Sequence, residues 1–306
     1  MSTTPNAIED FQQGSASAFH PTEPFLWSVR REIWEYRSIY VAPLIVAGLV
    51  LLGFVISSSH FAIRIRAAER LGPMQLQEAI EAPYGSGALF LMGIVFLISI
   101  FYSIEALQGE RRDRSILFWK SLPLSDLTVV LSKMVVPVVI LPVIAVVLTV
   151  VTHVVMLLLN LGIAQASGIS GATLWNNLSL SRMWLMMLYH MLALHGLWMA
   201  PFYAWLLLVS AWARRAAFLW AVLPLVAIGV VEKLAFNSRH FADWLFYRFG
   251  GAPAAEAYPG SHMAVHAWGH LSFTQFVLDP GLWTGLTAAA VFLFAAARIR
   301  RSRGPI

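Results

Sequence analysis

The stretch MVVPVVILPVIAVVLTVVTHVVMLLLN, residues 134–160, contains no Asp, Glu, Lys or Arg. A helix of about 20 apolar residues crosses the hydrocarbon core of a bilayer, so this stretch can span it and also tilt or extend past it. Pro137 and Pro142 would each cost a soluble helix about 3 kcal/mol, but membrane helices accommodate such kinks. The stretch therefore predicts a transmembrane helix.

The composition supports a membrane protein. The 306 residues are 58% hydrophobic and 12% charged, and the mean hydropathy is +0.69. Soluble domains average about 25% charged residues, so half that value leaves too little polar surface for an ordinary globule. The absence of cysteine excludes disulfides, thiolate metal sites and a cysteine nucleophile. We predict an integral membrane protein without a soluble catalytic domain.

Apolar segments define the predicted architecture. Residues 1–23 read as a disordered cytoplasmic tail, and because no apolar h-region follows a basic start there, we expect no cleaved signal peptide. Residues 24–306 form one transmembrane domain of an all-α membrane protein. Its six predicted transmembrane helices cover about 38–59, 87–107, 134–160, 183–211, 216–236 and 281–298.

The basic residues predict the orientation. With the N-terminus in the cytoplasm, the inner segments hold 14 of the 21 Lys and Arg residues and the outer segments hold seven. This excess fits the positive-inside rule, so we expect both termini to be cytoplasmic. The pI near 9.7 is then explained by topology, and no nucleic-acid partner is needed.

An amphipathic segment precedes the first predicted span. In PFLWSVRREIWEYRSIY, residues 24–40, Leu26, Val29, Ile33, Tyr36 and Tyr40 recur at steps of three and four. This pattern predicts an elbow helix over 24–37 that lies along the inner membrane surface. The alternative is a polar extension of the first span.

The segment EALQGERRDRSILFWKSLPLSD, residues 105–126, follows the second predicted span. A loop that only anchored lipid headgroups would not need Glu110 and Asp113, or four large apolar residues at 116–119. Charges around an exposed apolar patch favour docking to a protein partner. Pro123 should end the short helix, and Ser125 or Asp126 should cap the next one.

GERRDRSILFWKSLPLSD, residues 109–126, resembles the coupling segment of bacterial ABC-2 type transporter permeases. The resemblance implies two permease subunits, a homodimer or a pair, with two separate ATP-binding subunits docked on this cytoplasmic coupling helix. It also implies an N-terminal amphipathic elbow helix and an external re-entrant loop between spans five and six, at 237–280. The implied docking residues are Glu110, Arg111, Arg112, Asp113, Arg114, Ile116, Phe118 and Trp119.

No G-x-x-x-x-G-K-[ST] motif occurs, so the chain has no P-loop. We expect no cofactor in this chain, ATP and Mg²⁺ on the partner ATPase, membrane lipid as a further partner, and a location in the bacterial inner membrane. Charge reversal at Arg111 and Arg112 should then uncouple ATPase stimulation from transport. The apolar and aromatic spans favour export of a hydrophobic or amphiphilic substrate.

Polar residues within predicted spans are costly and often functional. Glu105 lies near the inner end of span two, where it can reach Arg111 or Arg112, and we favour a structural or coupling role. His153, His190 and His195 lie in the outer halves of their spans. They either form part of an exit path or make ordinary interhelical hydrogen bonds, and we favour the second.

His262, His266 and His270 are spaced by four, as zinc-binding histidines on one helical face can be. Gly269 weakens that helix and no carboxylate accompanies it, so a re-entrant helix without metal is preferred.

Three other classes of protein share parts of this pattern. A haem- or quinone-binding subunit could use the span histidines, but His190 and His195 are about 140° apart on a helix. An intramembrane hydrolase needs a serine beside a histidine, and Ser210 is predicted at the opposite membrane surface. The last class is a membrane assembly or scaffold protein without transport.

Overall fold

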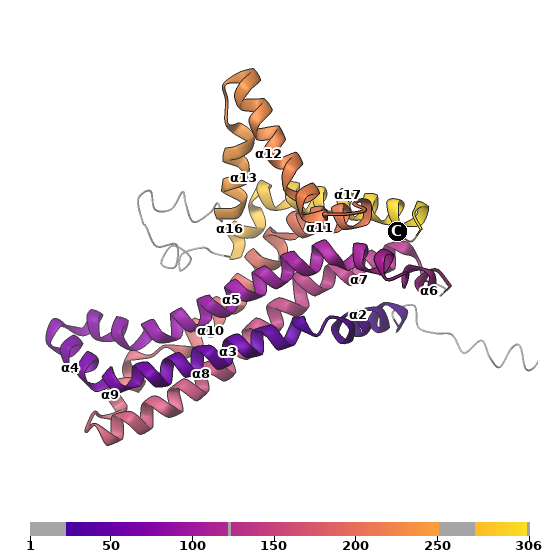
Figure 1. Ribbon diagram of the computed structural model, residues 1–306. Helices are drawn as coiled ribbons and strands as arrows, with labels where there is room; N and C mark the ends of the chain where they lie inside the picture. Colours follow the sequence, from indigo (N-terminus) through magenta and orange to yellow (C-terminus); the bar gives the residue numbers. More distant parts are fainter. Residues whose placement is uncertain (1–22, 122–123, 251–272, 305–306) are drawn as a thin grey trace, which may run out of the picture.

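The computed structural model describes residues 23–121, 124–250 and 273–304. Within these ranges the chain is helical with short connections and contains no strand, as predicted (Figure 1). The elements are α2 (Glu23–Glu35), α3 (Ser38–Ser57), η1 (Ser58–His60), α4 (Phe61–Leu71), α5 (Pro73–Arg112), α6 (Ile116–Ser121), α7 (Asp126–Val135), η2 (Val136–Ile140), α8 (Leu141–Ala166), α9 (Gly171–Asn177), α10 (Leu180–Tyr189), η3 (His190–Trp198), α11 (Ala200–Trp212), α12 (Ala217–Phe236), α13 (His240–Gly250), α16 (Phe273–Leu278) and α17 (Pro280–Ser302).

Five helical stretches of the described chain are long and apolar enough to cross a membrane. The number is six if 171–198 and 200–212, which meet at a 48° bend, form one broken span. Each predicted span overlaps one of these stretches, so the multi-pass helical architecture is confirmed. The helices extend further than predicted: α5 has 40 residues and is about 60 Å long, twice the hydrocarbon thickness of about 30 Å.

The extra length builds a small helical core at one end of the molecule. Figure 1 places α4 and α9 at this end, far from α2, α6 and the last turn of α17; we call the two ends the α4 end and the α6 end. Phe61 of α4, Ile80 of α5 and Leu174 of α9 pack together there. The connection between the first two spans is therefore helical.

The central core depends on small residues. Ala200, Ala204 and Ala211 of α11 and Ala289 and Ala296 of α17 are buried in one apolar cluster. Alanine lets two helix backbones approach closely, which is how membrane helices associate by packing. This pairing brings the C-terminal end of α17 to the α6 end.

Proline and close packing interrupt two of the spans. η2 and η3 are π-helical, and Pro137 lies in η2 while Pro201 follows the bend after η3. A side chain at Gly196 of η3 would lie 2.7 Å from the carbonyl oxygen of Val138 in η2. The two irregular segments therefore contact each other through backbone that only glycine admits.

The α12–α13 hairpin stands away from the other helices in Figure 1, and α12 is the least buried candidate span. Arg248 of α13 fastens the hairpin: its Nη1 donates to the Gly281 carbonyl (2.7 Å) and its guanidinium lies 4.2 Å from the Trp198 ring centroid. The Trp198 indole in turn donates to the Arg248 carbonyl (2.8 Å). Burial lowers the pKa of Arg248, while nearby Asp279 opposes that effect.

Gly285 leaves the space that this arginine fills. A Cβ at position 285 would lie 1.7 Å from Arg248 Nη2, so Gly285→Ala should expel the guanidinium. Overpacking of this kind lowers the free energy of unfolding by about 1–3 kcal/mol. Gly93→Ala is the matched control, because its Cβ would meet nothing within 4 Å. Equal unfolding of the two variants in detergent would contradict this account.

Candidate functional site

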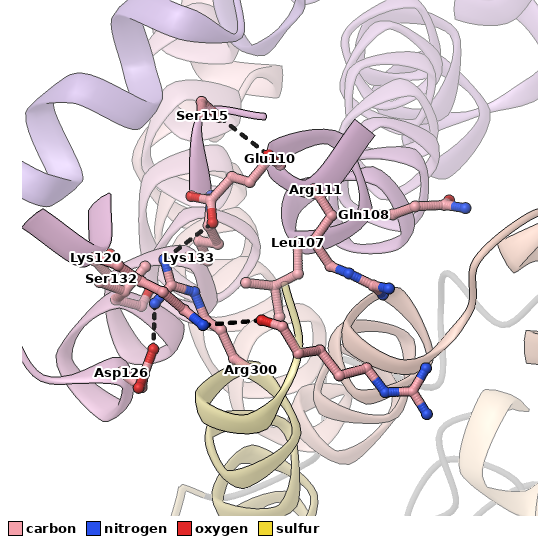
Figure 2. A network of polar contacts seen from close by, with 12 residues as sticks. Leu107, Gln108, Glu110, Arg111, Ser115, Lys120, Asp126, Ser132, Lys133 and Arg300 are labelled. Atoms are coloured by element: carbon pink, nitrogen blue, oxygen red, sulfur yellow. Dashed lines mark hydrogen bonds and ion pairs between the residues drawn. The ribbon is translucent and has the colours of Figure 1, made fainter. Parts of the chain in front are cut away.

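Charged side chains from four helices meet at the α6 end: Glu32 of α2, Glu110 of α5, Asp126 and Lys133 of α7, and Arg300 of α17. We call these five residues the charge cluster. All but Asp126 are at most 3% exposed, and Figure 2 shows Glu110, Asp126, Lys133 and Arg300 converging. Charges removed from water are tolerated only when they are paired, so each partner matters.

Lys133 of α7 contacts two carboxylates, one on α2 and one on α5. Its Nζ donates to Glu32 Oε1 (2.7 Å) and lies 3.0 Å from Glu110 Oε1, an ion pair outside hydrogen-bond geometry. The Tyr102 hydroxyl donates to the second Glu32 oxygen (2.7 Å). The carboxylate of Glu32 thus points into the bundle and fixes α2 to α5 and α7.

Arg300 joins the two ends of the segment that contains α6. Its Nη1 donates to Asp126 Oδ1 and its Nη2 donates to Glu110 Oε2 (3.2 Å). Glu110 lies in the last turn of α5 and Asp126 is the first residue of α7. One planar guanidinium therefore binds both ends of segment 110–126, which a lysine could not do with the same fixed geometry.

Local sequence positions Asp126. The Ser125 side chain caps α7 by accepting from the Thr128 amide (3.0 Å), which confirms one of the two predicted caps. Asp126 then lies in the first turn, where the positive helix end stabilises an anion.

Two residues where α2 ends, Glu35 and the half-buried Tyr36, are affected by the charge cluster. Burial raises the pKa of the Tyr36 phenol well above its usual range. Burial also raises the pKa of the Glu35 carboxyl, and the charge of Glu32 adds to this effect. The side chains of Glu32, Glu110 and Lys133 are themselves buried, and ion pairs are stronger in such an environment than at a solvated surface.

Glu110 and Arg111 lie inside the chain, although both were expected among the docking contacts. Glu110 belongs to the charge cluster. Arg111 is 4% exposed, and its Nη1 donates to the carbonyls of Ala211 (2.8 Å) and Ala213 (3.3 Å). It thus caps the C-terminus of α11, so charge reversal at Arg111 would damage the fold as well as any docking.

The short helix α6 divides its apolar residues between two faces. Ile116 and Trp119 are buried, whereas Leu117 and Phe118 are each 57% exposed. The Arg31 guanidinium of α2 lies 4.1 Å from the Trp119 ring centroid and 5.4 Å from that of Phe118. The buried face holds α6 against the chain, and the exposed pair faces outward.

Charged residues border this exposed pair. Arg112, Asp113 and Arg114 are exposed, and Arg114 ends the turn after α5 in the left-handed region, at φ +59°. Arg112 Nη2 donates to Glu105 Oε1 (2.7 Å), which confirms the predicted reach of Glu105 to one of its two candidate arginines.

Two of the three span histidines bond across helices. Trp184 Nε1 donates to His153 Nδ1 (3.2 Å), so the proton is on Nε2, which donates to the Tyr84 carbonyl (3.0 Å). His195 Nε2 lies 3.2 Å from the Tyr203 hydroxyl. The His153 bonds join α8 to α10 and α5, which is the interhelical bonding favoured above, and the His195 contact joins η3 to α11.

The third histidine, His190, has its Nδ1 2.9 Å from the Met186 carbonyl within its own turn. A part in an exit path stays a prediction for all three.

One serine–histidine pair, Ser99 and His195, was not identified from the sequence. Ser99 Oγ lies 3.3 Å from His195 Nε2, whereas Ser210 accepts hydrogen bonds from the Leu107 and Gln108 amides (3.0 and 2.9 Å). The Ser99 hydroxyl donates to the Val95 carbonyl (2.8 Å) and is therefore not available to donate to the ring. An activated nucleophile needs that donation, so this geometry favours structure over hydrolysis.

No group of three metal-binding side chains occurs in the described part of the chain. His262, His266 and His270 lie outside the described residues, as does nearly all of the predicted 1–23 tail. Comparison with protein-family models, with curated proteins and with solved structures gives no match to this chain.

Sequence reasoning missed the charge cluster as a unit. In the sequence, Lys133 and Arg300 count only among the basic residues that predict the orientation, and no local pattern assigns a partner to Glu32. A signal was present: Lys133 directly precedes the apolar run at 134–160, and a charge so placed needs a partner. Which acidic residue is the partner of Lys133 depends on how helices that are distant in the sequence are arranged.

Proposed function

We propose that this chain is the permease subunit of an ABC-2 type ATP-binding cassette transporter and exports a hydrophobic or amphiphilic substrate. The observation that carries the proposal is α6, a short helix that presents Leu117 and Phe118 outward. Large exposed apolar residues ringed by charges are typical of a protein-docking surface. The resemblance of residues 109–126 to a coupling segment gives that surface its partner, a separate ATP-binding subunit.

The charge cluster would transmit a movement of α6 to the neighbouring helices. Because Arg300 binds Glu110 and Asp126, a displacement of α6 pulls on α5, α7 and α17 together. Lys133 extends the connection to α2, the proposed elbow. ATP and Mg²⁺ would bind the two partner ATPases, whose closure would move α6 in each of two paired permease copies.

The remaining assignments follow from the charge distribution and the family resemblance. The α6 end is cytoplasmic in this proposal, together with both termini, and the membrane is a bacterial inner membrane. The segment 237–280 is external, with α13 and α16 as its described helices; a re-entrant course through the membrane is part of the proposal.

An apolar groove supports the proposed substrate class. An open groove of about 640 Å³ lies between α5, α11, α12 and α13; its lining is mostly apolar but includes Lys233, Arg239 and Asp243. Ile104, Phe202, Leu206, Val226 and Phe249 are among its lining residues, and ligand sites are typically apolar cavities of about 300–1,000 Å³.

The test is co-purification with the ATP-binding subunit encoded by a neighbouring reading frame. Leu117→Ser/Phe118→Ser should weaken the complex by about thirtyfold if the two residues form a hot spot worth about 2 kcal/mol, and ATPase stimulation should fall with it. Leu71→Ser/Met74→Ser is the control, since both side chains are exposed at the α4 end.

Full association of the Leu117/Phe118 variant would overturn α6 as the docking site. A correctly folded chain that binds no ATPase at all would favour the assembly or scaffold protein.

A further inference from the structure

A cleft of about 580 Å³ opens at the α6 end, between the end of α11 and the start of α12. It is lined by Trp212, Ala213, Arg214, Arg215, Trp220 and Arg303. Half of these residues are arginines and none is acidic. We call it the arginine cleft; it is separate from the charge cluster and from the exposed face of α6.

The positive charge of the cleft is not neutralised within the described chain. Arg303 Nη1 donates to the Trp212 carbonyl (3.0 Å), but neither an ion pair nor a hydrogen bond engages the guanidinium groups of Arg214 and Arg215 in the described residues. Arg111 adds a further like charge, since it interacts electrostatically with Arg214 and Arg303. Like charges held together favour a bound anion.

The start of α12 adds to this potential. Ala216 precedes the helix in the left-handed conformation, at φ +50°, and no side chain caps the first turn. The amides of a helix N-terminus carry a positive partial charge and bind phosphate or carboxylate. The 20-residue α12 thus directs its positive end to the same place as the arginines.

The aromatic and apolar residues around the cleft indicate its depth relative to a bilayer. Trp212 and Trp220 pack edge to face with centroids 4.7 Å apart, and Phe218 and Leu219 beside them are 56% and 62% exposed. Tryptophans and arginines next to an exposed apolar belt are typical of the headgroup region.

We propose that the arginine cleft binds a phosphate group, and that its source is the headgroup of an anionic phospholipid in the adjacent leaflet. Arginine suits this role because its planar fork donates two parallel hydrogen bonds to phosphate oxygens. The aromatic and apolar border favours a lipid over an acidic protein or a nucleic acid, neither of which needs an acyl-chain surface. The proposal requires only that the α6 end meets a membrane surface, and it holds whether or not the chain is a permease.

The experiment measures binding of a fluorescent phosphatidylglycerol to the full-length chain in phosphatidylcholine nanodiscs. Arg214→Gln/Arg215→Gln should weaken binding by about thirtyfold, because each basic residue near an anionic lipid contributes about a factor of five. The control is Arg70→Gln/Arg182→Gln, which removes the same charge from exposed positions outside the cleft. It should change binding by less than about twofold.

Competition by glycerol phosphate or inorganic phosphate separates the sources. If these compounds displace the labelled lipid from the wild type but not from the Arg214/Arg215 variant, a soluble phosphate can also fill the cleft. If they do not displace it, the lipid headgroup is the ligand. Equal binding by wild type and the Arg214/Arg215 variant overturns the proposal. So does a variant that keeps lipid binding but loses a protein partner, because the arginines would then serve acidic-protein docking.

Discussion

Replacement of Lys133 by Met is expected to lower the free energy of unfolding by about 3–5 kcal/mol, because it leaves the buried Glu32 carboxylate without its cation and leaves Glu110 with Arg300 alone among the described residues. Lys133 is 1% exposed, and its Nζ lies 2.7 Å and 3.0 Å from the two acids. Methionine fills a similar volume, so the decrease in unfolding free energy results from the lost charge rather than from lost packing. Unfolding of the purified chain in detergent, followed by tryptophan fluorescence, measures it.

Two further variants make the expected result specific. Lys233→Met removes an exposed lysine and should change stability by no more than about 0.5 kcal/mol. Glu32→Gln/Lys133→Met should be less destabilised than the sum of its two single changes, with a coupling of about 0.5–3 kcal/mol. Additive effects would show that Lys133 and Glu32 do not interact as the structure places them.

The sequence predicted the spans well because their signal is local. The apolar composition of a run such as 134–160 is enough to predict a transmembrane helix. The helix α12 (Ala217–Phe236) begins and ends within one residue of the predicted 216–236. The helix ends were less predictable: α5 begins at Pro73 rather than 87, because polar residues can extend a helix beyond the membrane. Hydropathy detects the apolar part only.

The α6 end was predicted in outline but not in its contacts. Periodicity gave the existence of α2, yet its Glu32 faces the bundle and Trp34 is 63% exposed. A carboxylate can be buried because Lys133, about a hundred positions later, neutralises it. Such a pairing exists only after α2, α5 and α7 assemble, so no local pattern in residues 24–40 could show it.

Replacement of Arg300 by Gln is expected to release both ends of segment 110–126 from α17. Arg300 binds Glu110 and Asp126 with separate nitrogens, and an uncharged amide cannot neutralise two carboxylates. The free energy of unfolding should fall by about 3–5 kcal/mol. At temperatures where the variant is still folded, α6 should become more mobile, since Arg300 joins both of its flanks to α17.

A spin label can report that mobility, because the natural chain has no cysteine and a single Leu117→Cys labels α6 alone. Arg300→Gln should narrow the spectrum of this label and leave that of a Leu71→Cys label at the α4 end unchanged. Arg301→Gln is the matched control: it removes the same charge one position along, from an exposed side chain. If Arg301→Gln mobilised α6 as much as Arg300→Gln, net charge at the end of α17 would be the cause. A response to Arg300→Gln alone would instead support a specific connection between α6 and the spans, which is what a coupling helix requires to transmit the motion of its partner.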